Sequence, residues 1–129
     1  MPLVRINLSD SYSADERQII GDTVYSAMVD IGKAPAGDKF LIFTRHADGE
    51  LIHPDAAFMG MEYTSKIVFV QVFWVASRST DVKKAFYRNI ADTLNEKVSI
   101  RKEDVWINLV DCAREDWSFG NGDMQYAPT

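Results

Sequence analysis

The sequence is poor in the residues that disulfides, metal sites and polyanion binding require. Cys112 is the only cysteine among the 129 residues, so no disulfide can form within the chain. Only two histidines, His46 and His53, are available as transition-metal ligands besides the cysteine, and we expect neither a metal nor another cofactor. Lysine and arginine form no cluster, glycine forms no phosphate-binding loop, and no apolar run has membrane-spanning length. These absences argue against nucleic acid, nucleotides and membranes as partners.

The overall composition is that of an ordinary globular protein. Hydrophobic residues make up 47% of the chain and charged residues 26%, and the formal net charge is −5. A chain of 129 residues fits a single domain, and we assign residues 1–129 to one. The first residues form a strand-like segment with an arginine inside it, which does not match a signal peptide. Together with the single cysteine, this predicts a cytoplasmic protein.

Two halves of the chain, roughly residues 1–52 and 66–110, repeat one order of elements, and a tail follows them. Each half contains a strand, a helix, a turn and a second strand. Ser13 and Glu16 form a capping-box pattern that starts the first helix, and Ser79 or Thr80 can cap the second. Apolar alternation and apolar runs predict strands at Leu3–Leu8, Phe40–Thr44, Lys66–Ala76 and Val105–Val110.

This order predicts an α+β fold, in which a tandem β-α-β repeat forms a four-stranded sheet with two helices on one face. A helical crossover makes the two strands of each unit parallel. We align Asp38 with Asp104, because an acidic residue precedes an apolar strand in both halves. The second face of the sheet has no helix to cover it, although Lys66–Ala76 is apolar on both sides. We therefore expect an obligate homo-oligomer.

Pro2 directly follows Met1, and its chemistry depends on whether Met1 is removed. A small second residue favours removal, and we expect the ring nitrogen of Pro2 to become a free secondary amine. An ordinary α-amino group titrates at about 7.7–8.0, so such an amine can take or give a proton near neutral pH. If Met1 stays, the nitrogen is an amide without useful basicity, and Pro2 is only the entry residue of a strand.

Five short segments carry a resemblance to a known family, in order along nearly the whole chain. They are Met1-Pro2-Leu3, Pro35-Ala36-Gly37-Asp38-Lys39-Phe40, Ser77-Arg78-Ser79, Phe86-Tyr87-Arg88 and Asp116-Trp117-Ser118-Phe119-Gly120. Together they resemble the tautomerase superfamily, and more closely its malonate semialdehyde decarboxylase branch. The resemblance implies a tautomerase (MIF-like) fold, catalysis by an amino-terminal proline, and assembly into trimers or hexamers. For a chain of this length it implies a homotrimer.

The same resemblance assigns roles to three residues. Pro2 matches the family's catalytic proline, Asp38 its catalytic aspartate, and Arg78 the second arginine of an Arg-Pro-Arg stretch in the decarboxylase. Ala76 and Ser77 stand where that stretch has its first arginine and its proline. This departure weakens the case for malonate semialdehyde as the substrate.

The chemistry of these residues suits a small oxo acid. The planar guanidinium of Arg78 can bind the carboxylate, and the start of a helix beside it adds positive potential. The carboxylate of Asp38 would favour the protonated amine of Pro2, whereas Arg78 and burial would favour the neutral amine. Trp117 and Phe119 would form an apolar wall that binds the substrate and excludes water.

Three functions remain open on the sequence alone. A neutral Pro2 can act as a base in the keto–enol tautomerisation of a 2-oxo acid such as phenylpyruvate. A protonated Pro2 can polarise a carbonyl, which suits decarboxylation of malonate semialdehyde with hydratase activity on unsaturated acids. The third function is a non-catalytic oligomeric module that binds a metabolite or a partner.

Overall fold

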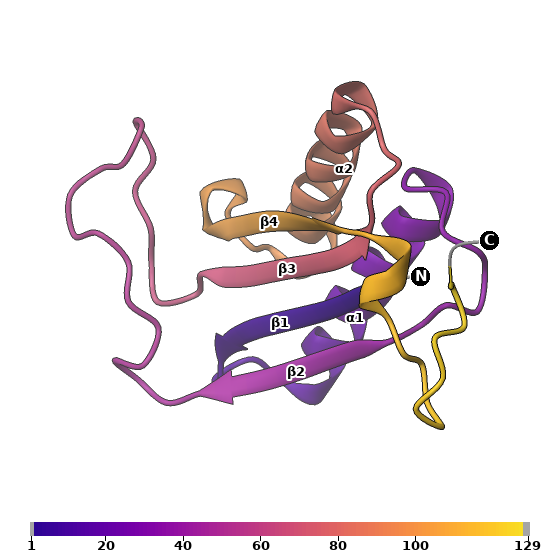
Figure 1. The fold of residues 1–129 in the computed structure, drawn as a ribbon. Coiled ribbons are helices and arrows are strands. Elements are labelled where there is room, and N and C mark those ends of the chain that lie inside the picture. Colours follow the sequence, from indigo (N-terminus) through magenta and orange to yellow (C-terminus); the bar gives the residue numbers. More distant parts are fainter. Residues whose placement is uncertain (1, 128–129) are drawn as a thin grey trace.

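Four strands form one mixed sheet, and two long helices cover one of its faces (Figure 1). The computed structural model describes residues 2–127. The elements are β1 (Leu3–Ser9), α1 (Ala14–Asp30), β2 (Leu41–His46), β3 (Val68–Val75), α2 (Thr80–Val98) and β4 (Val105–Cys112). The strand order is β2-β1-β3-β4; β1 is parallel to β2, β3 is parallel to β4, and β1 is antiparallel to β3. The predicted α+β fold with two β-α-β units is confirmed.

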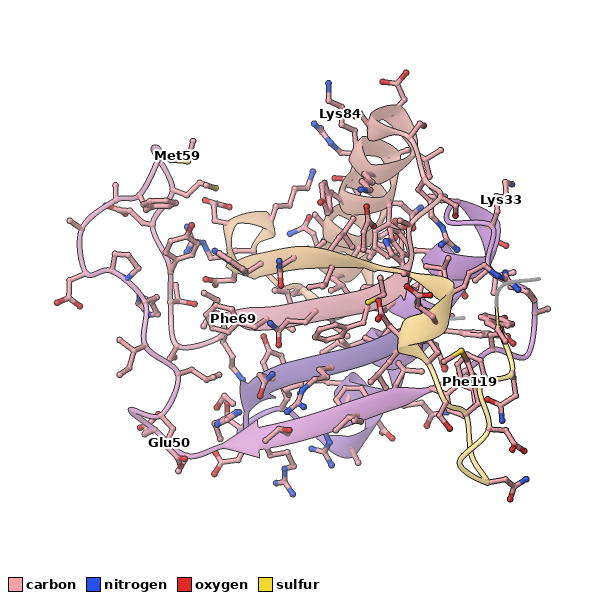
Figure 2. All side chains as sticks on the ribbon, viewed as in Figure 1. Lys33, Glu50, Met59, Phe69, Lys84 and Phe119 are labelled. Atoms are coloured by element: carbon pink, nitrogen blue, oxygen red, sulfur yellow. The ribbon has the colours of Figure 1, made fainter. Side chains whose placement is uncertain are left out.

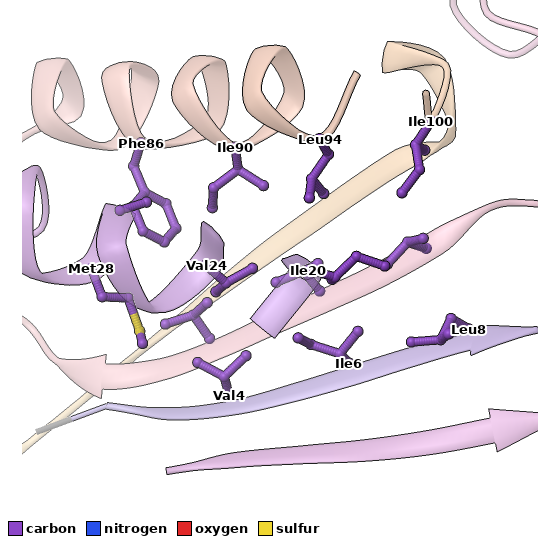
Figure 3. Close-up of a cluster of buried hydrophobic side chains, with 14 of the residues drawn as sticks. Val4, Ile6, Leu8, Ile20, Val24, Met28, Phe86, Ile90, Leu94 and Ile100 are labelled. Atoms are coloured by element: carbon purple, nitrogen blue, oxygen red, sulfur yellow. The ribbon is translucent and has the colours of Figure 1, made fainter. Parts of the chain in front are cut away.

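The sheet and both helices share one hydrophobic core. β1 buries every second side chain, because successive residues of a strand point to opposite faces of the sheet. Each helix buries one apolar stripe at helical spacing against these side chains. The core includes Val4, Ile6 and Leu8 of β1, Ile20, Val24 and Met28 of α1, and Phe86, Ile90 and Leu94 of α2 (Figure 3). Within residues 2–127, no helix is long and apolar enough to cross a membrane.

Serine residues cap both helices: Ser13, as predicted, and Ser79, one of the two caps that the sequence allowed for α2. The Ser13 hydroxyl accepts the backbone N–H of Glu16 at 3.1 Å, and the Glu16 carboxylate accepts the backbone N–H of Ser13 at 2.9 Å. This bond to the Ser13 backbone lowers the pKa of Glu16. Ser79 caps α2 by accepting the backbone N–H of Val82 at 3.2 Å. The capping box predicted for α1 is therefore confirmed.

Removing the Ser13 hydroxyl should weaken the start of α1. We expect Ser13→Ala to lower the free energy of unfolding by about 1 kcal/mol, because one backbone N–H of the first turn loses its acceptor. Urea denaturation of the two proteins measures this difference. Ser65→Ala is the matched control, since Ser65 is exposed in the loop before β3. Equal losses in both variants would show that the cap does not stabilise the helix.

The face of the sheet away from the helices remains partly exposed in the single chain. Trp106 and Ile42 are 41% and 42% exposed, and Phe69 and Phe73 are half-buried on the same face. β3 is therefore buried fully on only one side, whereas the sequence predicted burial on both. Most side chains of β3 that point away from the helices are apolar, and no element within residues 2–127 fully covers them.

The end of β4 differs from the sequence prediction. The strand was predicted to end at Val110, but it continues through Asp111 and Cys112, which belong to β4. The parallel ladder between β3 and β4 continues to the pair of Val75 with Cys112. Backbone pairing decides the strand end here, although an aspartate is a poor strand former. Cys112 is partly buried, and this burial raises the pKa of its thiol.

The alignment of Asp38 with Asp104 agrees with the structure. The parallel partner strand follows at the same sequence spacing in both halves, since Val4 pairs with Leu41 and Val68 with Val105. Asp38 and Asp104 also lie equally far along the chain from the helix caps Ser13 and Ser79. Asp104 ends a 3₁₀ turn that packs against the core, and its carboxylate is fully buried. It accepts hydrogen bonds from the backbone N–H and the hydroxyl of Thr64, which ties the loop before β3 to the start of β4.

Candidate active site

One edge of the sheet gathers every residue that the sequence nominates for the site. β1 begins at the edge where the antiparallel β3 ends, and the parallel partners bring the start of β2 and the end of β4 to the same edge (Figure 1). Pro2 precedes β1, Asp38 precedes β2, and Arg78 follows β3. Trp117 and Phe119 follow β4. Strand direction alone therefore brings these residues from four parts of the chain to one end of the molecule.

Pro2 is buried and lines an apolar hollow of about 290 Å³. The other lining residues come from β1, from the segment before β2 and from the tail; they are Leu3, Phe40, Trp117, Ser118 and Phe119. The lining formed by these described residues contains no charged side chain. Phe40 is 51% exposed although its backbone is fixed, since its carbonyl accepts the N–H of Val4 at 3.0 Å. A half-exposed phenylalanine on a fixed backbone can cover the apolar part of a ligand.

The tail after β4 is ordered by its own aromatic contacts. The rings of Trp117 and Phe119 stack with their centroids 5.7 Å apart, and Tyr126 meets Phe119 edge-on at 5.0 Å. The backbone N–H of Phe119 donates to the side chain of Gln125 at 2.9 Å. These contacts hold Phe119 at the end of the sheet (Figure 2). Among residues 2–127, no acceptor meets the buried indole N–H of Trp117.

Arg78 is held in a socket at the same edge. Its Nε donates to the carbonyl of Gly32 and its Nη1 to the carbonyl of Val75, both at 2.8 Å. The guanidinium carbon lies 4.4 Å from the centroid of the Trp74 ring, a cation–π contact. Partial burial lowers the pKa of Arg78, but an arginine stays charged at neutral pH. The Nη2 group has no hydrogen-bond partner among the described residues.

The register between β1 and β3 relates this socket to Pro2. Leu3 pairs with Phe73, so Pro2 and Trp74 are the next residues outward on the two strands. Both residues follow the alternation of the helix-covered face. Arg78, which rests on Trp74, therefore belongs to the same corner of the sheet as Pro2.

Asp111 supports the socket from β4. Its carboxylate accepts the indole N–H of Trp74 at 2.8 Å and the ammonium of Lys83 at 2.9 Å. These bonds, the one from Lys83 first, together with the positive charge of Arg78, lower the pKa of Asp111. The carboxylate is therefore ionised at neutral pH and stabilises two cations and one indole.

The lowered pKa of Asp111 predicts an acid-dependent loss of stability. A carboxylate with a depressed folded-state pKa stabilises the fold above its unfolded-state pKa, and this contribution is lost as the pH falls through the folded-state value. We expect the free energy of unfolding to decrease below about pH 4, and to decrease less in Asp111→Asn than in the wild type. Urea denaturation at neutral and acidic pH tests this. Parallel pH profiles for both proteins would contradict the role of Asp111.

The structure unites three of the predicted residues in one hollow and places two beside it. Pro2, Trp117 and Phe119 line the hollow, whereas Asp38 and Arg78 lie at the same edge outside its lining. Asp38 is half-buried in the turn where its backbone N–H donates to the carbonyl of Pro35. The sequence analysis treated Phe40 only as the first residue of a strand and missed it as a lining residue. Its position two residues after Asp38 was the available signal.

The structure leaves two predictions from the sequence untested, the removal of Met1 and the absence of a metal. The predicted removal of Met1 lies outside the described residues. Within residues 2–127, no group of three or more His, Cys, Asp or Glu side chains could hold a metal ion.

Two β-α-β units in one mixed sheet, with a hollow where the chain enters the first strand, define a small α+β fold with a candidate site at one sheet edge. Residues 38–120 match the family described as tautomerase enzyme. Probable tautomerase YusQ of Bacillus subtilis (strain 168) is 34% identical over 125 residues, covering 97% of this chain and 98% of YusQ. The chain belongs to the tautomerase family.

Two solved structures are similar over nearly the full length. FG41 malonate semialdehyde decarboxylase, inhibited by 3-bromopropiolate, has 34% identity and a TM-score of 0.87, covering 96% of this chain and 93% of that one. A second malonate semialdehyde decarboxylase, described for its decarboxylase and hydratase activities, has 28% identity and a TM-score of 0.87, with coverages of 96% and 95%. The resemblance to this branch of the tautomerase superfamily is confirmed.

Proposed function

We propose that this enzyme is a keto–enol tautomerase of small 2-oxo acids of the phenylpyruvate type, with the free amine of Pro2 as its acid and base. The observation that carries the proposal is the hollow of Pro2, Phe40, Trp117 and Phe119. Its aromatic lining suits an aryl or alkyl substituent better than the three carbons of malonate semialdehyde. Arg78 at the same corner supplies the cation that a 2-oxo acid requires.

The proton transfer follows from this arrangement. The substrate carboxylate binds the Nη2 group of Arg78, which has no protein partner in residues 2–127, while the substituent enters the aromatic hollow. The neutral Pro2 nitrogen takes a proton from the carbon beside the ketone, and the C–H electron pair forms the enolate. The protonated amine then donates to the enolate oxygen, which gives the enol and restores the neutral amine. Water exclusion by Trp117 and Phe119 strengthens both steps.

A substrate panel with a pH–rate profile tests the proposal. We expect turnover of phenylpyruvate to exceed that of malonate semialdehyde, and kcat/KM to fall as the pH drops below the pKa of the Pro2 amine. Activity that is instead lost as the pH rises would show that Pro2 works in its protonated form. Absence of turnover for every oxo acid would leave the non-catalytic binding module as the function.

Decarboxylation of malonate semialdehyde, with hydratase activity, is the second candidate. It is favoured by the 34% identity and the TM-score of 0.87 to a malonate semialdehyde decarboxylase. Ala76 argues against this reaction, because it occupies the position at which the decarboxylase has the first of its two arginines. The panel separates the candidates, since only this reaction releases carbon dioxide.

The assembly that we propose is a homotrimer. The partly exposed face with Ile42, Phe69, Phe73 and Trp106 supports self-association, because a second copy would remove these side chains from water. Analytical ultracentrifugation should give a mass about three times the 14.6 kDa of one chain. A stable monomer at micromolar concentration would contradict this assembly.

A further inference from the structure

The backbone carbonyls of Gly32 and Val75 and the ring of Trp74 orient the guanidinium of Arg78. Two of its nitrogens donate to the carbonyls of Gly32 and Val75, and its guanidinium carbon lies over the Trp74 ring, 4.4 Å from the centroid. The direction in which Nη2 points therefore depends on the plane of the Trp74 ring. Rotation of that ring would remove the cation–π contact with Arg78.

The backbone of Gly32 restricts the Trp74 ring from one side. A Cβ at Gly32 would lie 3.2 Å from Cζ3 of Trp74 and 2.9 Å from the carbonyl oxygen of Met28. Backbone and ring are thus packed so closely that no other side chain fits. This contact limits the ring on the side of α1, and the opposite end of the indole requires a separate partner.

Asp111 is that partner. Trp74 and Asp111 face each other across the β3–β4 ladder, and the indole N–H donates to one carboxylate oxygen at 2.8 Å. The other oxygen accepts Lys83 from α2 at 2.9 Å, so the carboxylate is itself fixed between two elements. Because Trp74 is fully buried, loss of this acceptor would leave its N–H without a partner.

We propose that Asp111 is a positioning residue, which holds the plane of Trp74 and thereby aims the free Nη2 edge of Arg78 at the substrate carboxylate. The proposal rests on the proposed function for the identity of the substrate. Asp111 is not one of the residues that line the hollow, and its effect passes through the indole N–H of Trp74. A variant that keeps an acceptor oxygen at residue 111 should therefore keep most of the positioning.

Kinetics with a charged substrate and a neutral one test this role. We expect Asp111→Ala and Trp74→Phe to raise KM for phenylpyruvate on the order of tenfold, because the bond to the carboxylate weakens, with a smaller change in kcat. KM for the methyl ester of phenylpyruvate should change by less than about twofold, since the ester offers Arg78 no charge. Asp111→Asn should recover most of the wild-type value.

Asp92→Asn is the matched control. Asp92 is also a carboxylate paired with a lysine from another element, Lys102 at 3.0 Å, and it lies in the second half of α2. We expect its kinetics with both substrates to equal those of the wild type. Equal effects of Asp111→Ala on the acid and the ester would overturn the positioning role and leave Asp111 with a purely structural one.

A second readout needs no turnover. In ¹H–¹⁵N spectra, the Nε–H of Arg78 should exchange slowly in the wild type and in Asp111→Asn, and rapidly in Asp111→Ala and Trp74→Phe. Slow exchange in Asp111→Ala would overturn the proposal even if that variant loses activity. If the wild type turns over no oxo acid but the exchange pattern is as expected, the proposed function fails while the positioning of Arg78 by Asp111 stands.

Discussion

Replacing Pro2 with alanine is expected to lower kcat/KM for phenylpyruvate by about 10²- to 10⁴-fold, the range typical of a lost general acid–base group. Alanine keeps a free primary amine after removal of Met1, but it loses the ring that packs into the wall of the hollow. The amine then lies at a different position relative to the substrate carbon. Steady-state kinetics at several pH values measure the loss.

The control for this prediction changes an exposed residue away from the hollow and from the face proposed for assembly. Gln18→Ala alters an exposed residue of α1 outside the lining of the hollow, and we expect its kcat/KM to stay close to the wild-type value. Both variants should unfold at a similar urea concentration. Full activity of Pro2→Ala on every oxo acid that the wild type uses would disprove catalysis by Pro2.

Replacing Arg78 with alanine is the second large effect that we expect. A hydrogen bond to a charged group contributes about 1.5–3 kcal/mol, so kcat/KM should fall by about 10- to 150-fold, mainly through KM. Arg78→Lys should recover only part of this, because an ammonium cannot occupy both carbonyls of the socket and still present a planar edge.

Arg45→Ala serves as the control for Arg78. Arg45 is an exposed arginine near the end of β2, at the opposite edge of the sheet, so its loss changes the net charge equally without touching the site. We expect no change in KM for this variant. A similar rise of KM in both variants would mean that overall charge, and not the socket, attracts the substrate.

Much of the fold was predictable from the sequence because its signals are local. The capping box of Ser13 and Glu16 and the apolar stripes of the two helices depend on neighbours within one or two turns. The helical crossover then predicts that the two strands of each unit are parallel. The antiparallel pairing of β1 with β3, which brings Arg78 to the edge of Pro2 and Asp38, joins the two halves and was not predicted.

The parts that sequence analysis missed depend on contacts between distant segments. The predicted strand stopped one residue before Asp111, yet the ladder with β3 extends through it and Trp74 supplies a donor. Phe40 was predicted only as a strand residue. Its place in the lining of the hollow depends on Trp117 and Phe119, which the tail brings back to the same edge. The bonds from Arg78 to Gly32 and Val75 likewise cross the chain and leave no local pattern.

Catalysis by a free amine on Pro2 can be tested by blocking that amine. Intact mass and phenylpyruvate turnover are determined on two samples, the natural protein and a form with one extra residue fixed before Pro2. We expect the natural protein to lack the mass of Met1 and to be active, and the extended form to have at least about 100-fold lower activity. Equal turnover by the extended form, in which the nitrogen is an amide, would show that a free Pro2 amine is not the catalytic group.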